Sequence, residues 1–201
     1  MLIGSSIDII FTTRKLNTMT FNPLFHNRQS IRLNFYDYSK VGIYFFTICI
    51  EDRRCLLGEI SNEEMFLSEL GEIALKEWHN LTFRFKNIEL GEFTIMPNHI
   101  HGIIIVKKIA QNDEKNLISQ TDVGATLAVA LPTLGNIIGA FKSLVTTSYL
   151  KILKDRNPDI ILGKLWQGNY FERIIKDEEG LRNASLYLKN NSKNWDRDEL
   201  S

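Results

Sequence analysis

The sequence predicts an α+β fold in which helices pack on an antiparallel, ferredoxin-like sheet. Runs rich in β-branched and aromatic residues lie at 42–50, 88–95 and 99–106, and each is typical of a strand. The second and third runs are separated only by Met96-Pro97-Asn98, so they should form an antiparallel hairpin. Apolar residues at helical spacing occupy the segments around these runs. The resulting order, β-α-β-β-α-β-α, favours an antiparallel sheet with helices on one side.

Composition limits the chain to one ordinary domain. Its 201 residues are 44% hydrophobic and 24% charged, enough to bury a real core. The formal net charge is zero, so any nucleic-acid-binding surface must be a local patch. Cys49 and Cys55 are the only cysteines and lack zinc-site spacing, which favours a reduced, cytoplasmic chain. No apolar run is long enough to cross a membrane, and the first residues make a poor secretory signal.

A segment that is both basic and aromatic precedes the first expected strand. Residues 22–40 contain Arg28 and Arg32 among interleaved phenylalanines and tyrosines. Such a segment can grip a nucleic-acid backbone and stack on bases. It can equally be a surface arm whose aromatic side chains enter the core, and composition leaves both interpretations open.

Three segments show helical patterning. Ser68 is a plausible N-cap for a helix whose apolar face is formed by Leu70, Ile73, Ala74 and Trp78. Residues 132–154 repeat apolar positions at helical spacing, with Lys142 off the stripe. A short turn and strand at 166–175 precede the last helix, 177–191, whose buried stripe is Leu181, Ala184 and Leu188. Residues 109–132 carry no pattern that assigns a role.

Two histidines stand at the start of the third strand. Successive side chains of a strand point to opposite faces, so His99 and His101 share one face and Ile100 takes the other. Two imidazoles a few Å apart suit a divalent metal. The same spacing also occurs on polar sheet surfaces, so the pair alone leaves both possibilities open.

The last helix carries the groups that such a pair would need. Tyr187 and Asn191 are four residues apart, so we expect them on one helical face beside the apolar stripe. A tyrosine phenol can act as a covalent nucleophile, and an amide oxygen can complete a site for Mg²⁺ or Mn²⁺. Taken singly, Tyr187 could be a half-buried core residue and Asn191 a helix-terminal one. Tyr170 is a rival nucleophile, although its neighbour Phe171 favours packing or base stacking.

Together these motifs resemble a known family. The stretch MPNHIHGIIIV at 96–106 resembles the His-hydrophobic-His (HUH) motif of single-tyrosine transposases. Further stretches are similar to the REP-associated tyrosine transposase branch, namely RQSIRL at 28–33, YDY at 36–38, YFFTIC at 44–49, GAFKS at 139–143, WQGNY at 166–170 and YLKNN at 187–191. The resemblance runs over residues 28–195. It leaves 1–27 as an N-terminal extension that need not be ordered and 196–201 as a tail.

The resemblance implies a fold of HUH endonuclease type and a specific reaction. Family members bind single-stranded DNA that forms hairpins and cleave it beside the hairpin foot. Carried over by position, Tyr187 would be the nucleophile, forming a 5′-phosphotyrosine and freeing a 3′-OH. His99, His101 and Asn191 would hold Mg²⁺ or Mn²⁺. Attack by another 3′-OH would rejoin strands, which makes the implied enzyme a DNA transposase.

The resemblance also suggests which residues contact DNA. The expected set is Arg28, Arg32, Lys142, Trp166, Tyr170 and Arg173. Two positions depart from the family pattern: Ser192 replaces a frequent proline, and Arg173 stands where a histidine is common. The first affects only how the helix ends, and the second could change strand preference. A single catalytic tyrosine per chain leaves both a monomer and a homodimer open.

Two other functions compete with a transposase. A catalytically inactive protein that binds hairpin DNA for regulation would keep the same basic and aromatic segments. A zinc-dependent hydrolase of small molecules would usually add an Asp or a further His just after the pair, and Gly102-Ile103-Ile104 offers neither.

Overall fold

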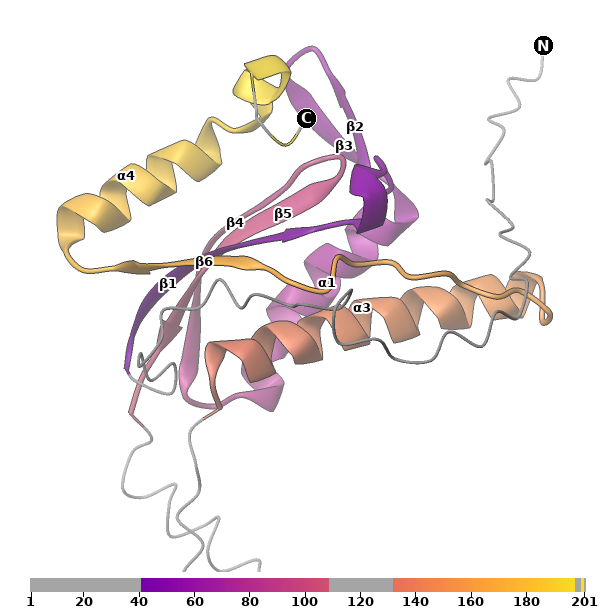
Figure 1. The fold of residues 1–201 in the computed structure, drawn as a ribbon, viewed down its shortest axis with the longest axis horizontal. Coiled ribbons are helices and arrows are strands. Elements are labelled where there is room, and N and C mark those ends of the chain that lie inside the picture. The colour runs from indigo at the N-terminus through magenta and orange to yellow at the C-terminus, as the bar shows by residue number, and fades with distance from the viewer. Residues whose placement is uncertain (1–40, 109–131, 198–199, 201) are drawn as a thin grey trace, which may run out of the picture.

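Four strands form the central sheet of the protein. The computed structural model describes residues 41–108, 132–197 and 200 (Figure 1). β1 (Gly42–Cys49), β4 (Ile88–Ile95), β5 (His99–Val106) and β6 (Phe171–Ile175) pair antiparallel in the order β4-β5-β1-β6. This is the strand order of a ferredoxin-like sandwich, so the predicted fold class is confirmed. The basic lead-in, with Arg28 and Arg32, and the proposed extension 1–27 lie outside the described residues.

Two helices cover one face of the sheet. α1 (Glu69–Arg84) and α3 (Leu134–Arg156) pack side by side against it (Figure 1). Alternation along β1 points Tyr44, Phe46 and Ile48 into this core, where all three are fully buried. The helix stripes fill the same space: the ring of Trp78 stacks on Phe93 at 4.4 Å between centroids. The main core therefore lies on the side of the sheet away from the histidines.

The third long helix lies on the opposite face. α4 (Glu178–Lys189) packs Leu188 against Ile103 and Ile175 in a second, smaller core. Figure 1 shows it separated from α1 and α3 by the sheet. The sequence predicted helices on one side only, and the last helix departs from that expectation. Between α4 and the sheet lies the face that carries His99 and His101.

A small hairpin and two short 3-10 helices complete the described chain. β2 (Gly58–Ser61) and β3 (Glu64–Leu67) form the hairpin, and η1 (Glu51–Arg53) and η2 (Ser192–Arg197) are the 3-10 helices. The hairpin was not predicted, because its turn residues Asn62 and Glu63 have positive φ without the usual glycine. None of the described helices is long and apolar enough to span a bilayer.

Candidate active site

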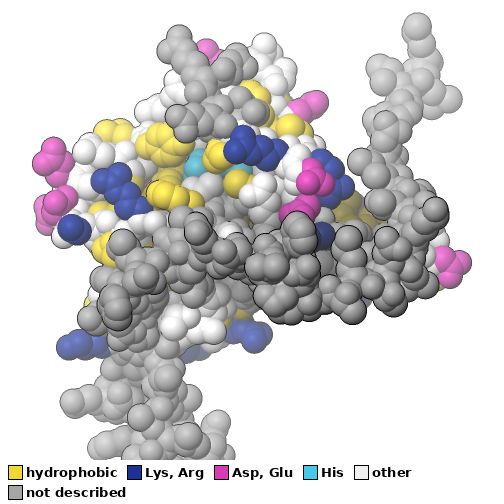
Figure 2. Space-filling view, in the orientation of Figure 1, with side chains coloured by type: hydrophobic (Ala, Val, Ile, Leu, Met, Phe, Trp, Pro, Cys, Tyr) yellow, Lys and Arg dark blue, Asp and Glu magenta, His cyan; other side chains and the backbone are white. Residues whose placement is uncertain are grey.

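The two histidines meet on the face of the sheet below α4. His99 is fully buried and His101 is 3% exposed. Their Nε2 atoms lie 3.0 Å apart, and Ile100 points into the core on the other face. The shared face predicted from strand alternation is therefore confirmed. In the region between α4 and the sheet, Figure 2 shows a small patch of histidine among hydrophobic and basic side chains.

Each imidazole is fixed through its other nitrogen. Thr47 Oγ1 lies 2.7 Å from His101 Nδ1, and Asn98 Oδ1 lies 2.7 Å from His99 Nδ1. Asn98 in turn donates from Nδ2 to the carbonyl of Leu200 at 2.7 Å. Partners at Nδ1 set the plane of each ring and leave both Nε2 atoms facing one another.

Burial keeps His101 uncharged. The desolvation of His101, together with the nearby His99, lowers the pKa of His101 from 6.5 to about 3. A neutral imidazole is the form that binds metals, because one ring nitrogen then keeps a free lone pair. The Thr47 hydroxyl can donate or accept, so it is compatible with either tautomer of His101.

Tyr187 brings a reactive oxygen to this pair. Its hydroxyl lies 3.4 Å from His101 Nε2, and the two rings meet edge to face at 5.5 Å between centroids. The residue is 47% exposed, in contrast to the buried histidines. Asp177 caps the start of α4, and Thr94 Oγ1 donates to the Leu188 carbonyl at 2.9 Å near its end. The helix is thus tied down next to its tyrosine.

Asn191 lies beyond the helix rather than on it. α4 ends at Lys189, so the predicted end at Asn191 was two residues too late. Asn191 is 1% exposed, and neither atom of its side-chain amide has a hydrogen-bond partner. Tyr187 before it contacts His101, and Trp195 after it stacks on His99 at 6.1 Å between ring centroids. A buried amide without partners is costly, and a ligand would remove that cost.

These groups could hold a divalent cation. Two adjacent ligands of an octahedral ion with bonds of about 2.1 Å are about 3.0 Å apart, the separation of the two Nε2 atoms. Two imidazoles and an amide oxygen form a donor set that could hold Mn²⁺ or Mg²⁺. Over 41–108 and 132–197, no three His, Cys, Asp or Glu side chains are grouped so that they could hold a metal ion.

The remaining predicted DNA contacts divide into two groups. Arg173 is exposed on β6, on the histidine face, and Tyr170 just before that strand is half-buried. Trp166 is instead 7% exposed, and its indole donates to Thr146 Oγ1 on α3. Lys142 Nζ donates to the backbone carbonyls of Gln167 and Asn169. Contact of any of these residues with DNA stays a prediction.

Sequence reasoning missed Thr47, Asn98 and Phe171. Thr47 pairs with His101 on one side and with Phe171 on the other, so the three form a row across β5, β1 and β6. Phe171 is 54% exposed in that row and offers an aromatic face beside the site. Alternation along β1 could have placed Thr47 on a face, but only the strand register shows which residue it meets.

Comparisons with known proteins agree with this fold. No protein-family model matches the chain. An uncharacterized protein of Haemophilus influenzae is 37% identical over 190 residues, covering 91% of this chain and 98% of that one. A solved REP-associated tyrosine transposase bound to a REP hairpin gives a TM-score of 0.54 at 16% identity, over 83% of this chain and 74% of the other.

A further solved structure, from Deinococcus radiodurans, reaches a TM-score of only 0.39 at 14% identity, over 79% of this chain and 95% of the other. That value is too low to show a shared fold. The likeness to the REP-associated transposase is strong enough to show one. The chain therefore belongs to one family with the Haemophilus influenzae protein, and its fold is that of a REP-associated tyrosine transposase.

Proposed function

We propose that the protein is a metal-dependent transposase that cleaves and rejoins single-stranded DNA next to hairpin repeats. One observation carries the proposal: the Tyr187 hydroxyl stands 3.4 Å from Nε2 of His101, which forms a buried pair with His99. The unpartnered amide of Asn191 follows on the same segment and supplies a third donor. A fold shared with a transposase bound to a REP hairpin supports hairpin-forming DNA as the substrate.

The exposures of the three side chains support the proposed roles. Tyr187 is half-exposed and can meet a phosphate, whereas His99 and His101 are almost completely buried. With its pKa lowered to about 3, His101 is also a poor proton acceptor near neutral pH. Tyr187 is therefore the nucleophile, and the histidines with Asn191 would be the ligands of Mg²⁺ or Mn²⁺. When bound, the ion would polarise a phosphoryl oxygen and favour attack on the phosphorus by the Tyr187 oxygen.

The proposed reaction conserves the number of phosphodiester bonds. The Tyr187 oxygen forms a bond to phosphorus while the bond from phosphorus to the 3′-oxygen breaks. The phenol proton passes to water, to which the tyrosine is open, and the departing 3′-oxygen takes a proton from water. The 5′-phosphotyrosine that results keeps the energy of the broken bond. A 3′-OH from another strand can then reverse the reaction, so strand transfer needs no external energy source.

A covalent adduct is the direct test. The purified full chain is mixed with hairpin oligonucleotides taken from the DNA flanking its gene, with Mn²⁺ or Mg²⁺, and separated on a denaturing gel. We expect an adduct with the wild type and with Tyr149→Phe, a half-buried tyrosine on α3 that serves as the matched control. Tyr187→Phe and EDTA should each abolish it. An undiminished adduct in Tyr187→Phe would reject this nucleophile.

A hairpin-binding protein without catalytic activity is the second candidate. The contact between His99 Nε2 and His101 Nε2 satisfies both rings without an ion, so the fold can persist without one. Binding that survives EDTA and His99→Ala, with no adduct on any flanking repeat, would favour this candidate. For the transposase, a single catalytic tyrosine per chain means that joining two ends takes two chains or two successive reactions.

A further inference from the structure

The edge of the sheet next to the site is interrupted by a bulge. β6 pairs with β1 up to Phe171 opposite Thr47. Pairing resumes where the Gln167 amide donates to the Cys49 carbonyl at 2.9 Å and Trp166 bridges Ile50. Three residues, 168–170, thus stand opposite the single residue 48 of β1. We call residues 168–170 the edge bulge; it lies at the end of β1 that adjoins His99.

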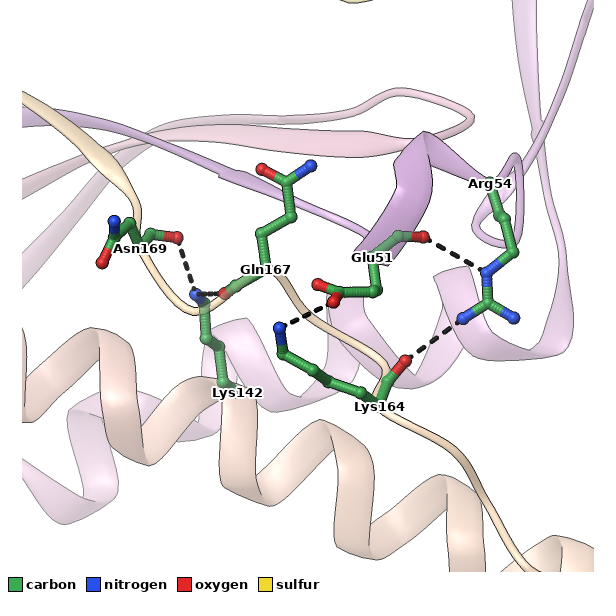
Figure 3. A network of polar contacts seen from close by, with 6 residues as sticks. All are labelled: Glu51, Arg54, Lys142, Lys164, Gln167 and Asn169. Carbon is green, nitrogen blue, oxygen red and sulfur yellow. Dashed lines mark hydrogen bonds and ion pairs between the residues drawn. The ribbon is translucent and has the colours of Figure 1, made fainter. Parts of the chain in front are cut away.

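A lysine from the far side of the sheet holds the backbone of the edge bulge. Lys142 Nζ donates to the carbonyl of Gln167 at 2.8 Å and to that of Asn169 at 3.2 Å (Figure 3). Burial, with a smaller effect from Lys164, lowers the pKa of Lys142 to about 8. The ammonium group is thus turned toward the protein backbone rather than toward solvent.

The segment before the edge bulge is tied down as well. Lys164 forms an ion pair with Glu51 at 2.7 Å, and Arg54 donates to the Lys164 carbonyl at 3.1 Å (Figure 3). The Glu51 amide donates to the carbonyl of Leu165 at 2.9 Å. Both sides of this segment, α3 and η1, therefore fix the backbone that leads into the edge bulge.

The fixed backbone presents Gln167 to the histidine face. The Trp166 indole points to α3, so alternation places the next side chain on the opposite face, beside Cys49. Figure 3 shows the Gln167 side chain directed away from Lys142 and α3. Cys49 pairs with His99, so Gln167 lies two strand spacings, about 10 Å, from that histidine. In the described part of the chain, nothing hydrogen-bonds to the side-chain amides of Gln167 and Asn169.

We infer that Gln167 reads a base beside the phosphate at Tyr187. Lys142 is then the positioning residue that holds residues 167–170, the reading loop, in place. This rests on the proposed function, in which the substrate is single-stranded DNA. A side-chain amide offers a donor beside an acceptor, and this pair matches the edge of a base. Phe171, exposed at the other end of the edge bulge, provides a face on which a base can stack.

Binding measured in EDTA tests base reading without any cleavage. The probes are hairpin oligonucleotides from the DNA flanking the gene, each carrying one of the four bases at one unpaired position beside the hairpin. We expect the wild type to prefer one base at one position by roughly 5- to 100-fold, with adenine the usual partner of an amide. Gln167→Ala should remove that preference and leave preferences at other positions. A Gln167→Ala protein with the wild-type preference, or a wild type without any, would overturn the inference.

Lys142 variants test the positioning role. Lys142→Met should weaken the same base preference as Gln167→Ala, because the carbonyls of the loop lose their donor. Lys142→Arg, which keeps two donors, should restore it, and Lys151→Met on the exposed side of α3 serves as the control. If Lys142→Met lowers the melting temperature but keeps the preference, the lysine is only structural. If it does not fold, Lys142→Arg decides by keeping or losing the preference.

The two proposals fail in different ways. If no adduct forms in Mn²⁺ but the base preference is intact in EDTA, the proposed transesterase activity is rejected and base reading by Gln167 is retained. An adduct whose yield and binding are the same for all four bases at every position would reject the reading loop alone.

Discussion

The hydroxyl of Thr47 gives the histidine pair two stable states. When it donates to His101 Nδ1, the His101 ring carries its proton on Nε2 and can donate to His99 Nε2. When it accepts from Nδ1, the Nε2 lone pair becomes free for a cation. A carboxylate in its place could only accept and would favour the second state. Threonine therefore suits a site that must be stable both with and without its ion.

Replacing this hydroxyl should selectively weaken metal binding at the proposed site. Thr47→Val keeps the shape of the side chain and its strand preference but removes the partner of His101 Nδ1. Loss of such a partner typically lowers metal affinity roughly 10- to 100-fold, and we expect that loss for Mn²⁺ measured by calorimetry. Thr82→Val, at a half-buried position of α1, should bind as the wild type does. Equal affinities for the two variants would contradict the role given to Thr47.

Sequence alone could place some residues of the site and not others. The common face of His99 and His101 follows from alternation within three residues of chain. The partner of His101 is 54 residues away, and no local pattern encodes the register that brings it there. Asn191 was placed on a helical face, whereas the helix ends before it and the amide turns inward. Tyr187 was placed correctly relative to the apolar stripe, because it lies within the helix.

At the scale of elements, α4 shows what an amphipathic pattern leaves undetermined. Its stripe of Leu181, Ala184 and Leu188 packs as predicted, against Ile103 and its neighbours. A stripe states that a helix buries one side, but not which face of a sheet receives it. The main core was already filled by α1 and α3, so the last helix had only the histidine face to cover. That outcome depends on the packing of all three helices together.

The anchor of α4 should control the reaction rate. Thr94→Val removes the hydrogen bond to the Leu188 carbonyl, so Tyr187 should spend less time at His101. We expect slower adduct formation, with a loss of about 1 kcal/mol in the free energy of unfolding. Glu92→Gln removes the exposed ion pair between Glu92 and Lys189 on the same helix and should change neither quantity much. Adduct kinetics and urea unfolding of the two variants make the comparison. Equal rates of adduct formation in Thr94→Val and Glu92→Gln would contradict the role given to the Thr94 hydrogen bond.

At the scale of the whole molecule, the sheet separates stability from chemistry. One face carries the large core beneath α1 and α3, and the other carries a small cluster together with the histidines and Tyr187. The strand and helix patterns were enough to predict the first face, because its apolar positions repeat regularly. The second face mixes polar and apolar residues, so its assembly could be inferred only through resemblance. The zero net charge agrees with a binding surface confined to that face.

The buried histidine should make the metal-free protein sensitive to acid. His101 has a pKa of about 3 when folded and 6.5 when unfolded, so the unfolded chain binds one more proton between these values. This contribution to stability is complete above pH 6.5 and falls by about 1.4 kcal/mol for each pH unit below it. Urea unfolding in EDTA, from neutral pH down to about pH 5, should show this slope, and His101→Gln should reduce it.

The exposed His79 of α1 supplies the matched substitution. His79→Gln should leave the acid slope of the wild type unchanged. The same slope in His101→Gln and in the wild type would mean that the buried imidazole does not cause the acid sensitivity.

The edge bulge also bears on how the protein avoids aggregation with other copies of itself. An open sheet edge is a template on which a strand of another chain can be added, the first step of edge-to-edge aggregation. Beyond Phe171 the ladder of β6 is out of register, and the carbonyls of Gln167 and Asn169 are already occupied by Lys142. A foreign polypeptide strand therefore finds no continuous row of partners there. A nucleic acid needs no such row, so the same irregular edge can exclude protein strands while it stays open to DNA.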